Sequence, residues 1–170
     1  NRLRAIGDLA GAQKAYQRGI ALAPSYSSGY QWYGEVLFYE IGDPEQGLPM
    51  FERALSLDPL SPVVRITYSS ALANAGRLEE AIASSAKLLA ENPGLPIATR
   101  LQASLYGQRG DLVQALRAHD TTIANEPAEP NLIDKCYTLL QFGAIAEVRR
   151  CAEKVATSYP KSQNQIKLQA

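Results

Sequence analysis

Apolar and small side chains recur along this chain at the spacing of an α-helix. One stretch places them three or four residues apart, at Ile66, Ser69, Leu72 and Ala73. A second stretch does the same, at Leu78, Ala81, Ile82, Ser85 and Leu88. Such spacing gathers the side chains on one face of a helix. No alternating apolar and polar stretch of useful length competes with it, so the sequence predicts an all-α fold.

Glycine and proline repeat along the chain in a fixed register. Five glycines follow one another at intervals of 35, 34, 34 and 33 residues: Gly7, Gly42, Gly76, Gly110 and Gly143. A proline stands seventeen residues after each glycine: Pro24, Pro59, Pro93, Pro127 and Pro160. A period of this length is typical of repeat proteins. The register predicts units of two helices, in which the glycine ends the first helix with a positive φ and the proline follows the second.

The register divides the chain into about five helix-turn-helix units within a single domain. The expected units are a partial unit at 1–26, full units at 27–61, 62–95, 96–129 and 130–162, and the start of a further or capping helix at 163–170. The unit around Gly42 is one residue longer than its neighbours and the unit around Gly143 is one residue shorter. We expect both changes within the first helix of the unit. Because the chain begins midway through a unit and without methionine, we expect it to be a fragment of a longer protein.

Two further columns of the register predict how the helices begin and how they pair. An aspartate directly follows three of the glycines, at Asp8, Asp43 and Asp111. A carboxylate at this position can accept hydrogen bonds from the free amides that open the next helix. Nearly all residues five positions after the glycines are small: Ala12, Gly47, Ala81, Ala115 and Val148. Small side chains at these positions let the paired helices approach closely.

The repeated unit resembles the tetratricopeptide repeat in its length, its small-residue columns and its final proline. Two segments carry the likeness most clearly, Gly76-Arg77-Leu78-Glu79-Glu80-Ala81-Ile82 and Gly110-Asp111-Leu112-Val113-Gln114-Ala115-Leu116. The resemblance covers the whole chain. It implies a right-handed α-solenoid whose first helices line a concave groove, and a groove that binds an extended peptide or a partner helix.

The resemblance also assigns the residues that line this groove. Carried over by register, with Trp32 added from the aromatic cluster around it, the expected partner-binding residues are Gln31, Trp32, Glu35, Phe38, Tyr39, Ile66, Ser70, Asn74, Arg100, Ser104, Gln108, Ile133, Tyr137 and Gln141. For Trp32 and Tyr39, a place in the core is the alternative to a place in the groove. The Lys and Asn set with which some members of the family clamp C-terminal carboxylates is absent from the matching positions. Arg100 is the one cation in the set and could pair with an acidic group on a ligand.

Composition narrows the class of partner. The 170 residues are 46% hydrophobic and 20% charged, which is typical of one folded domain. Seventeen basic and seventeen acidic residues give a formal charge of zero. This balance argues against binding to nucleic acid or to an anionic membrane surface, because both need a basic face. We therefore expect a protein or peptide partner, and no nucleic acid or membrane partner for this segment.

The sequence offers little for catalysis, for a metal or for a cofactor. The one histidine, His119, falls in the column that packs one helix pair on the next, so we expect a buried structural side chain. Cys136 and Cys151 stand fifteen residues apart with no Cys-x-x-Cys motif, which excludes a disulfide framework and a zinc site. We expect them as small buried thiols, with a single disulfide as the alternative. This cysteine usage favours a reducing, cytoplasmic compartment. We expect no enzyme, no metal and no cofactor.

The expected function is therefore a non-catalytic scaffold for protein–protein interaction. It would hold a partner peptide or helix in the concave groove through apolar contacts and amide hydrogen bonds. An alternative comes from a local resemblance, carried by Gln31-Trp32-Tyr33-Gly34 and the segment 54–62, to repeats of some bacterial signalling proteins. That likeness implies the regulatory or sensory arm of a transcription regulator or of a nucleotidyl cyclase. Self-association through the ends of the solenoid is a further expectation.

Overall fold

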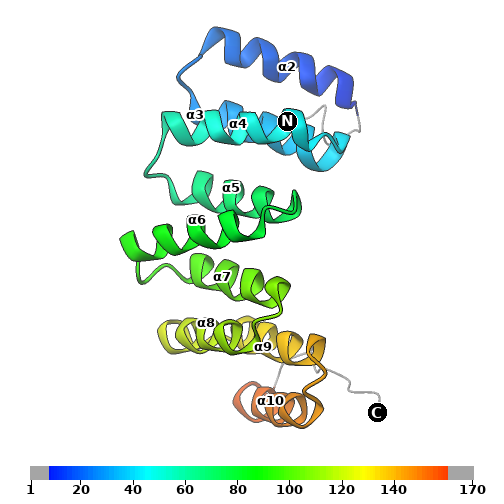
Figure 1. Ribbon diagram of the computed structural model, residues 1–170, viewed down its shortest axis with the longest axis vertical. Coiled ribbons are helices and arrows are strands. Elements are labelled where there is room, and N and C mark those ends of the chain that lie inside the picture. The colour runs from blue at the N-terminus through cyan, green and yellow to red at the C-terminus, as the bar shows by residue number, and fades with distance from the viewer. Residues whose placement is uncertain (1–7, 161–170) are drawn as a thin grey trace. The chain divides into compact units, whose positions relative to one another are not determined.

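The computed structural model describes residues 8–160, which Figure 1 shows as helices joined by short turns. In chain order the elements are α2 (Leu9–Leu22), α3 (Ser27–Glu35), the π-helix η1 (Val36–Ile41), α4 (Pro44–Leu57), α5 (Pro62–Asn74), α6 (Leu78–Glu91), α7 (Pro96–Arg109), α8 (Leu112–Asn125), α9 (Glu129–Gln141) and α10 (Ile145–Ser158). No strand occurs among the described residues, so the all-α prediction is confirmed. The expectations for Gly7 and for residues 163–170 lie outside the described residues.

Glycine ends the first helix of each pair, as the register predicts. The four described glycines of the register have φ between 68° and 84°, in the left-handed region: Gly42, Gly76, Gly110 and Gly143. Residues with a Cβ are strained there, and glycine is not. At the end of α7 the turn lets the backbone N–H of Asp111 donate to the carbonyl of Tyr106 at 2.9 Å. This bond satisfies one of the carbonyls that the end of a helix leaves free.

The three predicted aspartate caps are all present. Each carboxylate accepts a hydrogen bond from the backbone N–H three residues later, at 2.8 Å for Asp8, 3.0 Å for Asp43 and 3.1 Å for Asp111. In α4 the cap is followed directly by Pro44, whose missing N–H costs nothing in the first turn. The second helices α2, α4 and α8 thus carry a start signal of their own, independent of contacts with other units, whereas α10 has no side-chain cap.

Small residues let the paired helices approach closely. A Cβ added to Gly47 of α4 would lie 2.7 Å from the Cβ of Phe38 and 3.0 Å from the backbone nitrogen of Phe38. A Cβ added to Gly34 of α3 would lie 3.0 Å from the ring of Phe51. Ala81 and Ala115, from the same column as Gly47, are fully buried. The small-residue column therefore lies between the paired helices, as predicted.

The extra residue of the unit around Gly42 is accommodated in a π-helix. The first helix of this unit begins as α3 and continues without a break as η1. A π-helical turn holds one residue more than an α-helical turn, so an insertion can be absorbed without ending the helix. This agrees with the expectation that the insertion lies in the first helix. The insertion also rotates the residues of η1 about the helix axis, which changes the face that each side chain occupies.

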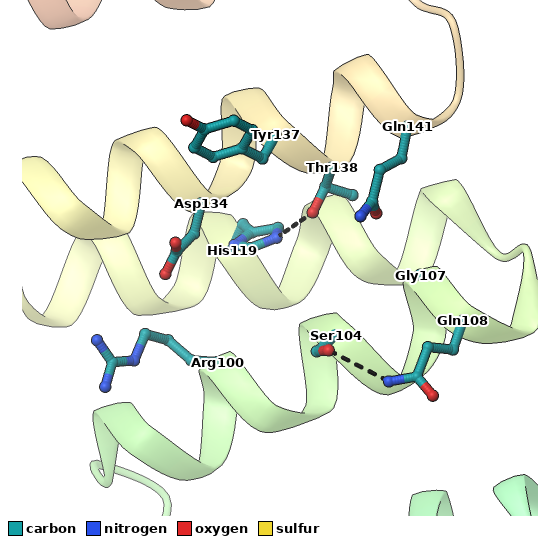
Figure 2. Close-up of a pocket in the computed structure, with 9 residues that line it drawn as sticks. All are labelled: Arg100, Ser104, Gly107, Gln108, His119, Asp134, Tyr137, Thr138 and Gln141. Atoms are coloured by element: carbon teal, nitrogen blue, oxygen red, sulfur yellow. Dashed lines mark hydrogen bonds between the residues drawn. The ribbon is translucent and has the colours of Figure 1, made fainter. Parts of the chain in front are cut away.

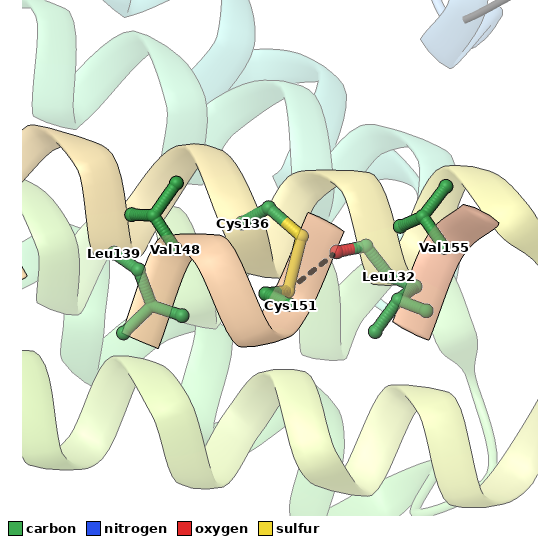
Figure 3. Close-up of a cluster of buried hydrophobic side chains, with 6 residues drawn as sticks. All are labelled: Leu132, Cys136, Leu139, Val148, Cys151 and Val155. Atoms are coloured by element: carbon green, nitrogen blue, oxygen red, sulfur yellow. Dashed lines mark hydrogen bonds between the residues drawn. A yellow bond between two sulfur atoms is a disulfide. The ribbon is translucent and has the colours of Figure 1, made fainter. Parts of the chain in front are cut away.

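Cys136 of α9 and Cys151 of α10 form a disulfide, which corrects the expectation of two free thiols. Their Cα atoms lie 5.6 Å apart. Figure 3 shows the bond inside a cluster of buried side chains from both helices, namely Leu132, Leu139, Val148 and Val155. Because α9 and α10 form a hairpin, residues fifteen apart in the sequence face each other across it. The bond also removes the support that free thiols gave to a reducing compartment.

The described helices belong to two compact units, which are larger than the repeat units of the register and divide between Leu88 and Leu89, within α6. They are called the first unit and the second unit below. In the first unit α2 packs on α3, α3 and η1 pack on α4, and α4 packs on α5. A hydrogen bond of 2.8 Å between the hydroxyls of Ser69 and Ser84 joins α5 to α6. In the second unit α7 packs on α8, α8 on α9, and α9 on α10. Sequential neighbours therefore pair within each unit. Within residues 8–160 no helix combines the length and apolar character that crossing a membrane requires.

Candidate partner-binding site

An open pocket of about 560 Å³ lies in the second unit, between α7 and α9 and above α8. Figure 2 shows α7 and α9 as its two walls. Five of the residues expected in the groove line it: Arg100, Ser104, Gln108, Tyr137 and Gln141. These five, which the resemblance carried over by register, come from two helices that the whole of α8 separates in the sequence. The pocket is the strongest candidate for a functional site among the described residues.

The wall from α7 is built by a spacing of four residues. Pro96 opens α7 and Gly110 ends it, so the whole segment between them is helical. Arg100, Ser104 and Gln108 therefore stand one above another on a single face. The Gln108 side-chain amide donates a weak hydrogen bond of 3.4 Å to the hydroxyl of Ser104. This wall offers a cation at one end and an amide at the other.

The wall from α9 contains a residue that the register missed. Asp134 lines the pocket together with Tyr137, Thr138 and Gln141. Counting back from Gly143 predicts Ile133 at this place instead, but Ile133 packs against the buried cluster around the disulfide. The position four residues after the opening proline is Arg100 in α7 and Asp134 in α9. The deletion in this unit therefore lies after Asp134, and counting forward from Pro130 would have found it.

His119 of α8 forms the floor of the pocket. It is only 4% exposed, and its Nε2 atom lies 2.8 Å from the hydroxyl of Thr138. Its Nδ1 atom is buried without a hydrogen-bond partner in the part of the chain that the structure describes. Burial lowers the pKa of His119, and the nearby carboxylate of Asp134 opposes that shift. The imidazole is therefore neutral at pH 7, and the prediction that this side chain is buried is confirmed.

Two of the residues expected in the groove are buried in the first unit. Gln31 is 6% exposed, and its amide donates to the hydroxyl of Thr67 at 3.2 Å. Phe38 is 8% exposed and belongs to a buried cluster with Phe51 and Ala71. Both assignments to an open surface are therefore corrected. For Phe38 the cause is the π-helix, which turns this side chain toward α4.

The other expected residues of the first unit remain at least partly open to solvent. They are Trp32, Glu35, Tyr39, Ile66, Ser70 and Asn74. Trp32 is 44% exposed and lies edge-on to the ring of Tyr26, with 6.1 Å between the ring centroids. Tyr39 is 47% exposed. Partial burial raises its pKa, although a hydrogen bond with the side chain of Asn74 opposes this shift. Trp32 and Tyr39 are thus surface residues rather than core residues.

The arrangement in the second unit suits binding better than chemistry. The histidine of its lining is buried and neutral, and the two charged residues of its walls, Arg100 and Asp134, stand on opposite helices. Among the described residues no group of three His, Cys, Asp or Glu side chains could hold a metal ion. Hydroxyl and amide groups dominate the remaining lining. Such groups both donate and accept hydrogen bonds, as the backbone of a bound peptide requires.

Comparison with known proteins identifies the family. Residues 39–105 match the family model described as Tetratricopeptide repeat. Residues 39–105 are tetratricopeptide repeats, and the chain has the fold of solved tetratricopeptide-repeat structures. The crystal structure of MamA protein has the same fold, with a TM-score of 0.74, 20% identity, and coverage of 94% of this chain and 87% of that one.

Two curated relatives are much longer than this tetratricopeptide-repeat segment. TPR repeat-containing thioredoxin TTL4 of Arabidopsis thaliana is 33% identical over 117 residues, which are 69% of this chain and 16% of that protein. Protein O-mannosyl-transferase TMTC1 of Homo sapiens is 24% identical over 134 residues, which are 79% of this chain and 15% of that protein. The chain thus spans about a sixth of the length of either relative.

Proposed function

We propose that this tetratricopeptide-repeat segment is a protein-interaction module, and that the pocket between α7 and α9 holds an extended segment of its partner. Repeats of this family generally bind protein partners and usually have no catalytic activity of their own. The observation that carries the proposal is the convergence of five register-assigned residues in one open pocket. Tyr137 is 53% exposed at the rim, and tyrosine is among the residues that dominate binding energy at interfaces.

The exposed residues of the first unit extend the proposal. Trp32, Tyr39 and Asn74 would form a second contact region for the same or another partner, since two half-exposed aromatic side chains offer rigid contact area. Gln31 and Phe38 have no part in it, because both are buried. The alternative function, a sensory or regulatory arm of a bacterial transcription regulator or cyclase, stays a prediction. Neither the pocket nor the relatives favour it.

Selection from a displayed peptide library tests the proposal. We expect wild-type protein to enrich peptides whose affinity falls about tenfold or more with Tyr137→Ala, the loss typical of an interface hot spot. Leu140→Ala is the matched control, because Leu140 is 41% exposed on the same helix but does not line the pocket. Peptides that bind both variants as tightly as wild type would place the working surface elsewhere and contradict the proposal.

A further inference from the structure

The charges of the pocket stand at one end only, on opposite walls. Figure 2 shows Arg100 on α7 and Asp134 on α9 at the same end, and Gln108 and Gln141 at the other end. Arg100 and Asp134 are both partly buried. Within residues 8–160 neither side chain has a salt bridge or a hydrogen bond. The pocket therefore presents one unneutralised cation and one unneutralised anion across an open gap.

The length of the walls limits what can lie between them. Arg100 and Gln108 are eight residues apart on α7, which at 1.5 Å per residue corresponds to about 12 Å. An extended chain rises about 3.3 Å per residue, so about four residues of a peptide span this distance. A ligand that reaches both ends of the pocket therefore places one or two of its residues at the charged end.

Side chains of an extended peptide point alternately to opposite sides. When such a peptide runs along the pocket, one residue at the charged end faces α7 and its neighbour faces α9. An acidic side chain facing α7 would reach Arg100, and a basic side chain facing α9 would reach Asp134. Two acidic neighbours would set a carboxylate against Asp134, and two basic neighbours would set a cation against Arg100. Like charges in contact oppose binding, so the walls select against both of these pairs.

We propose that this pocket recognises an acidic residue next to a basic residue in the partner segment. Arg100 pairs with the acidic side chain and Asp134 with the basic one. Beyond the charged pair, the side-chain amides of Gln108 and Gln141 bind the peptide backbone, so they do not select particular side chains there. This inference rests on the proposed function, because it specifies the ligand of the same pocket. It also explains how a groove with no net charge can still select peptides by the charges of their side chains.

The test is a selection of random decapeptides on wild type and on three charge variants, each first checked for wild-type helicity and thermal unfolding. Wild type is expected to enrich adjacent acidic and basic residues above their frequency in the unselected library. Arg100→Glu leaves two acidic walls, so it should enrich two adjacent basic residues. Asp134→Arg leaves two basic walls and should enrich two adjacent acidic residues. The double variant restores one charge of each sign and should return to the wild-type preference.

Synthetic peptides from the wild-type selection give the quantitative result. Replacing either charged residue of the pair with glutamine should weaken binding about two- to fivefold, as expected for one solvated ion pair, and added salt should reduce the difference. Arg149→Glu is the control, because Arg149 is exposed on α10 and does not line the pocket. It should leave the preference unchanged.

The two proposals fail in different ways. Enriched peptides that lack a charged pair, but lose affinity with Tyr137→Ala, would overturn the charge recognition and leave the pocket as the binding site. The same holds if the variants enrich the same sequences as wild type. If no peptide is enriched, or if none depends on Tyr137, both the charge recognition and the proposed function are wrong.

Discussion

The close approach of α4 to η1 makes an unusual prediction for Gly47→Ala. In the interior of a helix, alanine is normally more favourable than glycine by about 1 kcal/mol. Here the added methyl group would lie 2.7 Å from the Cβ of Phe38 and 3.0 Å from its backbone nitrogen. A backbone contact cannot be relieved by rotating a side chain, so α4 and η1 must separate. Overpacking of this kind costs about 1–3 kcal/mol. Subtracting the gain in helix propensity from this cost, we expect a net loss of up to about 2 kcal/mol in the free energy of unfolding.

Gly19→Ala is the matched control. Gly19 lies inside α2, and a Cβ there would meet nothing within 4 Å. The same substitution should therefore stabilise this helix by about 0.5–1 kcal/mol, because only helix propensity changes. The two variants have identical chemistry and lie in the same unit, so the opposite signs isolate the contact between α4 and η1.

Urea unfolding followed by tryptophan fluorescence measures both variants. Trp32 is the one tryptophan of the chain and lies on α3, the helix that continues into η1. The midpoint should fall for Gly47→Ala and rise for Gly19→Ala, with the slope of the transition unchanged. If Gly47→Ala stabilised the protein as much as Gly19→Ala, the small-residue column would not be the place where the helices meet, and our account of the pairing would be wrong.

Three further predictions concern the disulfide, the buried histidine and a second small residue. The Cys136–Cys151 bond closes a loop of about fifteen residues, so reducing it should destabilise α9 and α10 by about 3 kcal/mol. Amide hydrogen exchange in these two helices should then become about a hundredfold faster. Equal exchange rates in the oxidised and the reduced protein would argue against the bond. Burial lowers the pKa of His119, so the folded chain binds this proton less readily than the unfolded chain, and the unfolding free energy should fall as the pH drops below 6.5. The urea midpoint should therefore be lower at about pH 5.5 than at about pH 7.5, and His119→Gln should make this difference smaller. If the difference is the same in the variant, other groups cause it. Ala81→Leu should lower the unfolding free energy by about 1–3 kcal/mol in a urea titration, because Ala81 is fully buried, and a neutral result would put the register in error.

The sequence was sufficient to predict the features that local chemistry determines. A glycine with positive φ and an aspartate that caps the next helix act through their own neighbours, so Gly110 and Asp111 could be assigned without any knowledge of tertiary contacts. The family resemblance, carried over by register, assigned Ser104 and Tyr137 to one groove, because both stand six residues before the glycine of their unit, and both line the pocket.

The errors came from positions where the register changes or where two helices must meet. Phe38 lies in the π-helix, which turns it inward, and the sequence does not show where along a helix an inserted residue is absorbed. Asp134 was not predicted because the positions of its helix were counted back from Gly143, across the deletion, rather than forward from Pro130. The disulfide was missed because spacing alone does not fix the directions of two side chains. Only the observed hairpin brings the Cα atoms of Cys136 and Cys151 within 5.6 Å.

The central claim is that the face shared by α7 and α9 is the working surface of this protein. Amide-resolved NMR, recorded while a library-selected peptide is titrated into the isotope-labelled chain, tests it most directly. We predict that the largest shift changes fall on residues 100–108 and 134–141, with only small changes on the outer face of α10. Changes confined to α10, or spread evenly over the second unit, would contradict the claim.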